Sequence, residues 1–503
     1  MTEPRAVSGV DAPIAAASRA RHRSCTRPAV GRAFGSRHTA PPTTSRAEMT
    51  HDALDSPAAP GPGASSVLAM LQVGFTEGAL TPVDHIERVL TRLRHDPHNA
   101  VVALDEERAL RDATELGAEL RRRGPRSPLH GVAVGVKDLI DVAGLPTRAG
   151  SAVRTGAAPA RADAAVISRL RRAGAIVVGK LHTHEFGHGP TGDVAVSGPA
   201  RNPHDPTRIT GGSSSGPAAA VAAGHLPLAI GTDTGGSVRI PAALCGVVGL
   251  KPSWAALPRR GVYPLAPSLD HVGLLAADLY TALAGWEVLG VGSRQDPVHP
   301  PRPIRVGVPQ HEYWTLLDAP IAAATARAAH ALDTAGVQVV PVDTPQIYRL
   351  AAAYMPILGR EAYAVHAAAL AERAEDFQPA TYAGLRSYAE YPRHDYLAAK
   401  RAARQLSAGL GAHLADIDAL LTPTTRTRAT PLAQPFVSIG TERTTVAAAL
   451  LELTLPFNLT GWPAVSVPAP GSGLPIGLQL VGTGTAGSDE RTLLHLARII
   501  QAL

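Results

Sequence analysis

Four lysines stand out in a chain whose 48 basic side chains are otherwise all arginine: Lys137, Lys180, Lys251 and Lys400. A lysine retained amid so many arginines suggests a task that arginine cannot perform, such as losing its proton. Lys137 is the strongest candidate, because it ends the apolar run Val132–Val136, where desolvation would favour the neutral amine. The nearby Asp138 and Asp141 offer an ion pair instead, so this lysine alone leaves a base and an ion pair equally open.

Two stretches rich in glycine and serine supply candidate nucleophiles. In "GGSSSGPAAAVAAG" (211–224) three serines open a helix of small residues, where backbone N–H groups lack partners and a plain helix cap is the alternative. In "GTDTGGSVRIPA" (231–242) a strand ends in a tight turn, and Ser237 begins a helix. Gly235 and Gly236 let successive N–H groups converge beside the Ser237 hydroxyl, as an acyl-transfer nucleophile requires. Phosphate binding or a structural turn would explain this stretch as well.

The segment "LHTHEFGHGP" (181–190) matches the zinc protease pattern H-E-x-x-H through His184, Glu185 and His188. Zinc binding by this pattern needs both histidines on one face of a stable helix. Here the segment follows a strand directly and contains Gly187, and Gly189-Pro190 comes next, residues that weaken and end helices. We therefore expect no metal, and a polar loop in which His184 and Glu185 hold backbone groups.

Two further patterns are expected to be coincidental. "GAIVVGKL" (174–181) is close to a phosphate-binding loop, but Leu181 replaces the magnesium-binding Ser or Thr, and the expected loop is itself a strand. "GSSSG" (212–216) fits a nucleophile elbow centred on Ser214, which requires a strand immediately before it. A proline-rich loop, "NPHDPTRITG", precedes it instead.

The elements that would position these residues alternate between short apolar strands and helices. This alternation predicts an α/β fold with a sheet covered on both faces. The helices are expected at 66–94, 163–175, 213–224 and through 346–415. The strands are expected at 130–142, 176–180, 227–233, 247–252, 304–309, 337–342, 417–423, 464–468 and 476–482.

Composition bounds the class of protein. The 503 residues are 45% hydrophobic but only 4% aromatic, so Ala, Val and Leu must fill the core. No run of 18 uncharged apolar residues occurs, which argues against an integral membrane anchor. The two cysteines, Cys25 and Cys245, exclude a disulfide scaffold and favour a cytoplasmic location.

The net charge of +6 does not predict a nucleic-acid partner, because it is concentrated at one end of the chain. Residues 1–48 hold eight arginines, three acids and no lysine, so the other residues together carry only +1. This stretch lacks the apolar region of a secretory signal and reads as a transit peptide, a disordered arm or sequence upstream of a true start at Met49. We therefore divide the chain into a tail, 1–62, and one folded domain, 63–503.

The stretches around the candidate residues together resemble the amidase signature family, in the order of that family's blocks. "VAVGVKDLIDVAGLPTRAGS", "GGSSSGPAAAVAAG", "AIGTDTGGSVRIPAALCGVVGLKPS" and "PSLDHVGLLAADL" carry the resemblance, as do "DALLTPTT", "NLTGWPAVSVP" and "LPIGLQLVG" near the C-terminus. It covers about residues 66–503 and implies a single large α/β domain with a central mixed β-sheet covered by helices on both faces. One departure is Ser215, where the commoner family pattern has Gly, followed by Pro217.

The resemblance implies a Ser–cis-Ser–Lys triad that works through an acyl-enzyme without a metal or organic cofactor. Matched by motif position, Ser237 is the nucleophile, Ser213 the bridging cis-serine and Lys137 the base. Ser214 would support this network. Lys180, Asp233 and Arg239 would make structural polar contacts. The oxyanion donors would be the backbone N–H groups around Thr234, Gly235, Gly236 and Ser237.

The function implied is hydrolysis of a small-molecule carboxamide, aryl or aliphatic, to an acid plus ammonia or an amine. The alternatives within the same family are the glutaminase (A) subunit of a tRNA-dependent amidotransferase, which needs partner subunits, and a carbamate or hydrazide hydrolase. A homodimer is left open. The substrate would be bound by residues 346–415 and by loops near 425–460. Tyr354, Met355, Tyr382, Tyr391 and Trp462 are candidates to line that site, although core packing is the better expectation for each.

Overall fold

A single mixed sheet organises the part of the chain that the computed structural model describes, residues 66–290, 303–344, 346–484 and 489–502. Its strands are β1 (Val101–Leu104), β2 (Ala133–Lys137), β3 (Ile176–Leu181), β6 (Leu228–Asp233), β7 (Val248–Lys251), β8 (His271–Ala276), β9 (Arg305–Pro309), β10 (Gln338–Val342), β11 (Ala419–Pro423), β14 (Ala464–Pro468) and β15 (Gly477–Gly482). Their order across the sheet is β1-β3-β2-β6-β8-β7-β14-β15-β11-β9-β10. Because β2 runs parallel to β3 and β6 while β8 runs antiparallel to β6 and β7, the predicted mixed sheet is confirmed.

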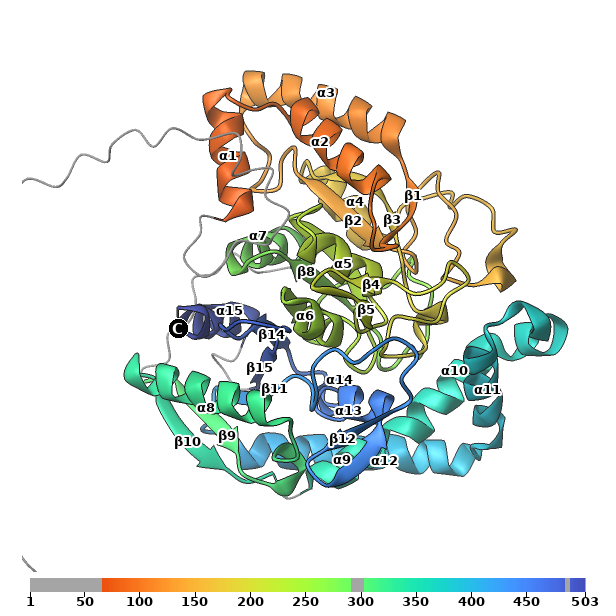
Figure 1. Cartoon of the computed structure of the whole chain (residues 1–503), viewed down its shortest axis with the longest axis vertical. Helices are drawn as coiled ribbons and strands as arrows, with labels where there is room; N and C mark the ends of the chain where they lie inside the picture. The colour runs from red at the N-terminus through yellow and green to blue at the C-terminus, as the bar shows by residue number, and fades with distance from the viewer. Residues whose placement is uncertain (1–65, 291–302, 345, 485–488, 503) are drawn as a thin grey trace, which may run out of the picture. The chain divides into compact units, whose positions relative to one another are not determined.

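Helices and two small hairpins surround this sheet (Figure 1). The hairpins are β4 (Arg201–Asn202) with β5 (Asp205–Ile209), and β12 (Phe436–Ile439) with β13 (Glu442–Thr445). The helices are α1 (Val67–Glu77), α2 (Pro82–Arg94), α3 (Glu106–Arg123), α4 (Ala165–Arg172), α5 (Ser215–Ala222), α6 (Arg239–Cys245), α7 (Leu279–Leu289), α8 (Ala319–Thr334), α9 (Ile347–Ala352), α10 (Tyr354–Glu372), α11 (Pro379–Ser387), α12 (Arg393–His413), α13 (Val446–Leu451), α14 (Pro456–Leu459) and α15 (Glu490–Gln501).

The strand β2 shows how the sheet is covered on both faces. Val134 and Val136 are buried in a cluster with residues of α1, α4 and α7. Ala133, on the opposite face, is buried with residues of α2, α3 and α5. Successive side chains of a strand point to opposite faces, so a strand whose residues are all buried needs helices on each side. The two predicted helical layers are therefore present, and β2 ends at Lys137 between them.

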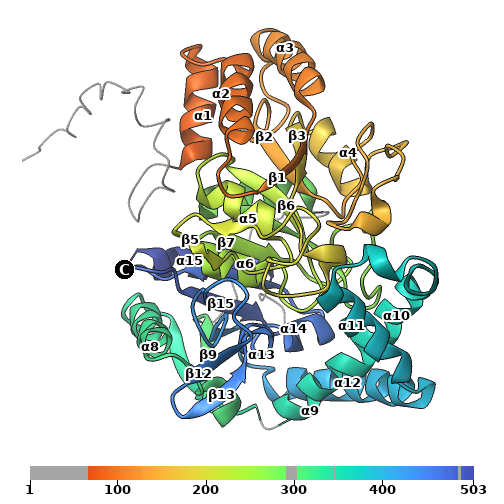
Figure 2. The ribbon, with the colours of Figure 1, turned by 45° about the vertical axis from the view of Figure 1, so that its right-hand side comes forward.

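The helical segment predicted over 346–415 is confirmed as α9, α10, α11 and α12. Its buried residues form a second core cluster, which also includes Leu420 of β11 and Val481 of β15. Figure 2 shows α10, α11 and α12 gathered on one side of the molecule, away from α1, α2 and α3. The helices of this segment therefore pack against the part of the sheet that β14, β15 and β11 form.

The single helix predicted over 66–94 is wrong, because the structure has two helices there. α1 ends at Gly78, whose φ of 72° is left-handed and suits glycine. α2 begins at Pro82 and is capped by Thr81, whose hydroxyl accepts the Asp84 N–H at 3.1 Å. Both signals stand in the sequence "TEGALTPVD", and the continuous apolar spacing on either side concealed them.

Two strands of the main sheet were not predicted. β8 is a fully buried run of six residues from His271 to Ala276, lying between β6 and β7. β1 is a strand of four residues at the edge of the sheet. Short apolar runs do not distinguish a buried strand from other buried segments by periodicity.

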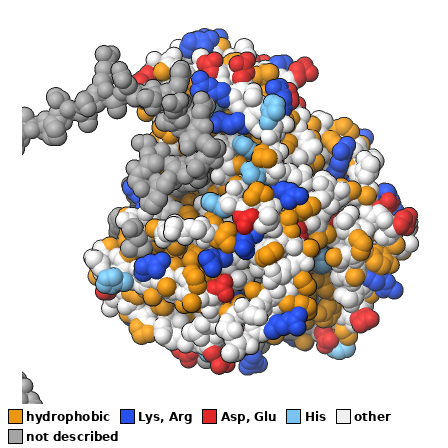
Figure 3. Space-filling view, viewed as in Figure 1, with side chains coloured by type: hydrophobic (Ala, Val, Ile, Leu, Met, Phe, Trp, Pro, Cys, Tyr) orange, Lys and Arg blue, Asp and Glu red, His pale blue; other side chains and the backbone are white. Residues whose placement is uncertain are grey.

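All described residues belong to one compact unit. The predicted tail, 1–62, and Cys25 lie outside the described residues, and the boundary at 62/63 stays a prediction. On the face seen in Figure 3, basic and acidic side chains are interspersed. Among the described helices, none combines the length and the apolar character that crossing a bilayer requires.

Candidate active site

Lys137 lies at the carboxyl end of β2 and is fully buried. Its Nζ is 2.8 Å from Ser213 Oγ and 2.8 Å from Thr232 Oγ1, so two hydroxyls are its hydrogen-bond partners. Burial lowers the pKa of Lys137 to about 7, and the more distant carboxylates of Asp233 and Asp270 only partly oppose this effect. A lysine in this environment exchanges its proton near neutral pH.

The alternative of an ion pair between Lys137 and a neighbouring aspartate is not adopted. Asp138 instead pairs with Lys180 at 3.0 Å, and both side chains are fully buried. Asp141 accepts the hydroxyl of Thr147 at 2.7 Å. The neighbouring acids are thus occupied, and among the described residues Lys137 forms no ion pair.

Ser213 is held against Lys137 by an unusual backbone. The peptide bond between Gly212 and Ser213 is cis, in agreement with the cis-serine that the resemblance implied. The carbonyl of Ser213 accepts the N–H of His184 at 3.1 Å and the hydroxyl of Thr183 at 3.1 Å. These two contacts come from the loop that follows β3, so this loop holds the backbone of Ser213 in place.

A backbone hydrogen bond between Ser214 and Ser237 links the segment 211–224 to the segment 231–242. The N–H of Ser214 donates to the carbonyl of Ser237 at 3.2 Å. The Ser214 hydroxyl donates to Thr232 O at 3.1 Å and accepts the Thr232 N–H at 3.3 Å, so it serves the backbone of β6. A supporting place for Ser214 agrees with the sequence analysis, and the elbow reading with Ser214 as nucleophile has no support here.

Ser237 lies in the turn between β6 and α6 and is 6% exposed to solvent. Among the described residues its hydroxyl has no hydrogen-bond partner, and none joins it to the hydroxyl of Ser213. The Ser237 hydroxyl is therefore free to meet a bound molecule, while the Ser237 carbonyl is anchored by the N–H of Ser214.

Asp233 organises the backbone of this turn. Its carboxylate accepts the N–H of Gly236 at 2.9 Å and the N–H of Val238 at 3.1 Å. Within the described residues, the N–H groups of Thr234, Gly235 and Ser237 have no such acceptor. Of the predicted oxyanion donors, Gly236 is thus already engaged by Asp233, and its two chain neighbours together with Thr234 remain available.

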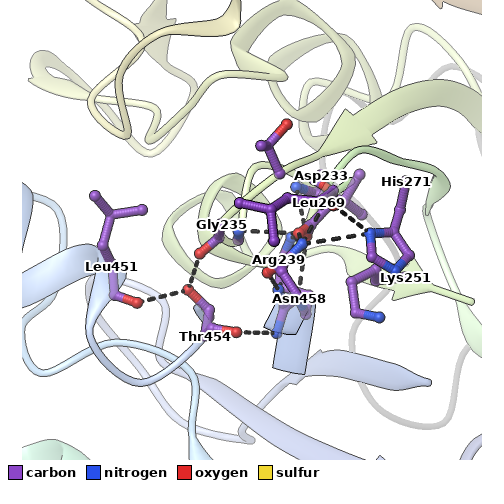
Figure 4. Close-up of polar contacts among 12 residues, drawn as sticks. Asp233, Gly235, Arg239, Lys251, Leu269, His271, Leu451, Thr454 and Asn458 are labelled. Carbon is purple, nitrogen blue, oxygen red and sulfur yellow. Dashed lines mark hydrogen bonds and ion pairs between the residues drawn. The ribbon is translucent and has the colours of Figure 1, made fainter. Parts of the chain in front are cut away.

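Arg239 holds Asp233 in place from the first residue of α6 (Figure 4). Its Nε and Nη2 donate to the two carboxylate oxygens of Asp233 at 3.0 and 2.9 Å. The remaining donors reach the Thr454 carbonyl at 3.0 Å, Gln479 Oε1 at 2.7 Å and Asn458 Oδ1 at 2.7 Å. Arg239 and Asp233 are both fully buried, and Arg239 contributes to holding the pKa of Asp233 far below its usual range against the opposing effect of burial. A fully bonded buried pair of this kind orients the turn rigidly.

Thr454 fixes the glycines of the turn from the C-terminal half of the chain. Its hydroxyl bonds to the carbonyl of Gly235 at 2.6 Å and to the carbonyl of Leu451 at 3.0 Å, as Figure 4 shows. Gly236 has a φ of 137°, and a Cβ there would collide with the Thr454 hydroxyl. Only glycine therefore satisfies both the backbone conformation and the close approach at this position.

The H-E-x-x-H segment, predicted as a loop, contains a single 3-10 turn at Glu185–Gly187 and forms no α-helix. The N–H of Gly192 donates to His184 Nδ1 at 3.2 Å, and the N–H of Gln378 donates to Glu185 Oε2 at 2.9 Å. His188 Nε2 and the hydroxyl of Tyr388 are hydrogen-bonded at 2.9 Å. In the described part of the chain no cluster of His, Cys, Asp and Glu side chains suits a metal ion.

The other patterns in the sequence have structural places. Residues 176–181 form strand β3 and not a phosphate-binding loop. Ser215, the departure from the commoner family pattern, opens α5, and its Oγ lies 2.8 Å from His182 Nδ1. Pro217 lies in the first turn of α5, where proline is tolerated because the N–H groups there lack helical partners.

Several residues that shape the site were missed by the sequence analysis. Thr232, which contacts Lys137, is a strand residue without a distinctive pattern. Thr454 and Asn458 carry the anchor for the Ser237 turn, and only Asn458 falls in a quoted block, "NLTGWPAVSVP". Of the side chains expected near the substrate, Tyr354 is buried beside Gly235, whereas Met355 is 38% exposed.

Comparison with protein families and curated proteins gives a consistent match. The family model described as Amidase matches residues 84–493. The chain is 36% identical over 420 residues to AtzE, the 1-carboxybiuret hydrolase subunit of Pseudomonas sp. (strain ADP), covering 80% of this chain and 90% of that protein. It is 34% identical over 469 residues to the A subunit of the glutamyl-tRNA(Gln) amidotransferase of Chloroflexus aggregans, covering 84% of this chain and 93% of that protein.

Solved structures agree with the sequence matches. A crystal structure of an amidase superposes with a TM-score of 0.79 at 35% identity, covering 86% of this chain and 98% of that one. A structure of a vestigial protein complex related to the origins of an s-triazine catabolic enzyme gives a TM-score of 0.79 at 33% identity over the same shares of the two chains. The likeness therefore covers most of this chain and nearly all of each of the two solved chains.

The Asp233–Arg239 pair yields a prediction on stability. Replacing Arg239 by Met keeps much of the side-chain volume but leaves the buried carboxylate of Asp233 without its cation. We expect Arg239→Met to lower the free energy of unfolding by about 3–5 kcal/mol, since a buried charge loses its partner. Denaturant unfolding followed by circular dichroism measures the change.

The matched control is Arg111→Met, which removes an exposed ion pair with Glu107 on α3. We expect this variant to stay within about 0.5 kcal/mol of the wild type. Equal unfolding curves for the two variants would show that the buried pair does not stabilise the fold.

Proposed function

The chain belongs to the amidase signature family, whose members hydrolyse amide C–N bonds, and we propose that it does so through an acyl-enzyme on Ser237. In this proposal Ser213 relays a proton between Ser237 and Lys137. The chain as a whole is a hydrolase of amide bonds, and the substrate is proposed to be a small-molecule carboxamide.

The observation that carries the proposal is the 2.8 Å contact between Lys137 Nζ and Ser213 Oγ inside a buried site. A general base works best when its pKa lies near the working pH, and burial brings the pKa of Lys137 to about 7. Lys180 and Lys251 are equally buried but are bound to a carboxylate and to two backbone carbonyls. Lys137 is the buried lysine whose described partners are hydroxyls that can transfer a proton.

Acylation follows from this arrangement. Neutral Lys137 takes the proton of Ser213, and Ser213 takes the proton of Ser237 as the Ser237 oxygen forms a bond to the amide carbonyl carbon. The carbonyl π-electrons move to the oxygen, and the free N–H groups of the turn stabilise that oxyanion. Ser213 then gives a proton to the leaving nitrogen, which departs as the C–N bond breaks, and Lys137 returns its proton to Ser213.

Deacylation uses the same groups in reverse. A water molecule loses a proton through Ser213 to Lys137 and attacks the ester carbonyl. The intermediate collapses, Ser237 receives the proton back, and the carboxylic acid leaves. Every step is a proton transfer or an acyl transfer between groups of this chain, water and substrate.

A second candidate function is supported by the likeness to the A subunit of the amidotransferase. In that case this chain would release ammonia from glutamine for a partner subunit. The similarity to AtzE, at nearly the same identity, supports hydrolysis of a small amide instead. A carbamate or hydrazide hydrolase would use the same acyl-transfer chemistry.

The purified chain on its own distinguishes these candidates. We expect it to release ammonia from simple carboxamides faster than from L-glutamine, because acyl transfer at Ser237 needs only groups of this chain. Ammonia release measured by a coupled glutamate dehydrogenase assay gives both rates. Faster ammonia release from L-glutamine, or activity that requires a second subunit, would favour the function of an amidotransferase subunit.

The nucleophile is tested by labelling with a fluorophosphonate probe in EDTA, followed by intact-mass spectrometry and peptide mapping. We expect one adduct, on Ser237. Lys137→Ala should slow the labelling by at least about a hundredfold, since the general base is lost.

Lys400→Ala is the control for the lysine substitution, because Lys400 lies on α12 beside Glu361, outside the proposed relay. It should label at the wild-type rate. An adduct on Ser214, or labelling that ignores Lys137→Ala, would exclude the assigned relay.

The pH dependence of labelling follows from the lysine. Because the pKa of Lys137 is about 7 and the neutral amine is the active form, the rate should fall by about tenfold per unit as the pH drops below 7. Above pH 8 it should level off. A stopped-assay series from pH 5.5 to 9 measures this profile, and a rate that stays constant between pH 6 and 8 would contradict a lysine base.

A further inference from the structure

Tyr354 brings a phenol to the turn that carries Ser237. It is the first residue of α10 and is 3% exposed. A Cβ on Gly235 would collide with the Tyr354 hydroxyl oxygen, so the hydroxyl lies directly against the backbone of the turn. Among the described residues this hydroxyl has no hydrogen-bond partner. An unpaired phenol at this position is suited to contact a molecule bound at Ser237.

A second ring reaches the site from the loop after β3. A Cβ on Gly187 would lie 3.5 Å from the Ser213 hydroxyl, so this loop borders the proposed relay. The next residue, His188, is bonded to the hydroxyl of Tyr388 at 2.9 Å, with the two rings edge-on at 5.5 Å between centroids. The aromatic wall, as we name it, consists of His188, Tyr354 and Tyr388.

Glycines in α10 and α11 allow the rings of the wall to pack closely against these two helices. A Cβ on Gly359, in α10, would lie 3.0 Å from the ring of Tyr388. A Cβ on Gly384, in α11, would lie 2.7 Å from the ring of His188. Besides burial, Tyr388 helps to raise the pKa of the Tyr354 phenol, and that phenol lies against Gly235 in the turn of Ser237. The wall therefore extends from the loop beside Ser213 to this turn.

Aromatic residues are scarce elsewhere but concentrate here. The chain has ten tyrosines, and six of them lie in the segment that contributes α10, α11 and the start of α12. These are Tyr354, Tyr363, Tyr382, Tyr388, Tyr391 and Tyr396. Such a local excess in a chain that is 4% aromatic points to flat ring surfaces as a requirement of this segment.

The wall is uncharged near neutral pH. Burial lowers the pKa of His188 to about 4, so its imidazole is neutral. Burial and the neighbouring Tyr391 raise the pKa of Tyr388 to about 12. Burial also raises the pKa of Tyr354 well above its usual value.

The charged groups that border the wall are held by other partners. Asp270 accepts the hydroxyl of Thr234 at 2.7 Å and two backbone N–H groups at 3.1 Å. Asp233 is bound by Arg239, and Glu185 accepts the hydroxyl of Ser151 at 2.6 Å. The guanidinium of Arg154 lies over the ring of Tyr263 at 4.9 Å. The three carboxylates are thus held within the chain, and the Arg154 guanidinium is directed at the Tyr263 ring and the Thr147 carbonyl.

We propose that the aromatic wall selects an uncharged aromatic carboxamide, whose ring lies against His188 and Tyr388 and whose amide meets the Tyr354 hydroxyl. This inference rests on the proposed acyl transfer at Ser237. An ionised substituent would lose its hydration against the wall without gaining a counter-charge. A zwitterion such as glutamine and an anionic amide are both disfavoured for this reason.

The test is protection of Ser237 from the fluorophosphonate probe by amides that differ in charge. The amides are 4-methylbenzamide, its anionic analogue 4-carbamoylbenzoate, its cationic analogue 4-(aminomethyl)benzamide, the saturated 4-methylcyclohexanecarboxamide, and L-glutamine. We expect 4-methylbenzamide to give half-maximal protection at a concentration at least about tenfold lower than any charged amide. It should also protect better than the saturated analogue.

The phenol of Tyr354 is tested in the same assay. Tyr354→Phe should raise the protecting concentration of 4-methylbenzamide by about three- to tenfold, because one hydrogen bond is lost. Tyr280→Phe is the control, since Tyr280 is 47% exposed on α7 and bonds to Gln72. It should leave protection unchanged.

The outcomes separate the two proposals. If Ser237 labels as expected but charged and neutral amides protect equally, the aromatic wall does not select its ligand and only this inference is overturned. The inference is likewise overturned if the saturated amide protects as well as 4-methylbenzamide. It is also overturned if 4-methylbenzamide protects Tyr354→Phe and the wild type at the same concentration. If Ser237 does not label at all, the proposed acyl-enzyme itself is overturned.

Discussion

The geometry of the site depends on one buried ion pair, Asp233 with Arg239. The carboxylate takes two N–H groups of the turn that carries Ser237, and the guanidinium ties that turn to the C-terminal part of the chain. A charge pair removed from water stabilises little unless every donor is satisfied. Here each nitrogen of the guanidinium has a partner, so desolvation is offset and the backbone of the turn has a single arrangement.

The three buried lysines of the described structure show how surroundings decide the role of one residue type. Lys180 has a carboxylate partner, Asp138, and Lys251 donates to two backbone carbonyls. Lys137 contacts two hydroxyls instead. Hydroxyls solvate an ammonium less well than a carboxylate does, yet they can pass a proton on. The same burial that stabilises the sheet therefore lowers the pKa of Lys137, as the proposed role of a base requires.

The sequence was informative wherever the signal was local. The apolar run before Lys137 marked a candidate base, with an ion pair as the alternative, and the glycines before Ser237 marked a candidate nucleophile turn. The strands from 130–142 to 476–482 were found by their apolar runs. The helix break at Gly78 was missed although Gly78 and Thr81-Pro82 mark it, because the apolar spacing continues on either side. The buried strand β8 was missed because periodicity does not mark it. The capture of the Gly236 N–H by Asp233 and the approach of Tyr354 to Gly235 arise from packing between distant segments, which no single stretch encodes.

The contacts of Arg239 also determine at which stage of synthesis the site can be assembled. Its partners Thr454, Asn458 and Gln479 follow it by 215, 219 and 240 positions along the chain. A ribosome releases the chain from its N-terminus, and domains complete their packing only when their last elements emerge. The nascent protein therefore carries its serines and its lysine long before they are aligned. The turn that carries Ser237 obtains its anchors only once the segment from Thr454 to Gln479 has been made, and we expect a chain that ends before Thr454 to lack this arrangement.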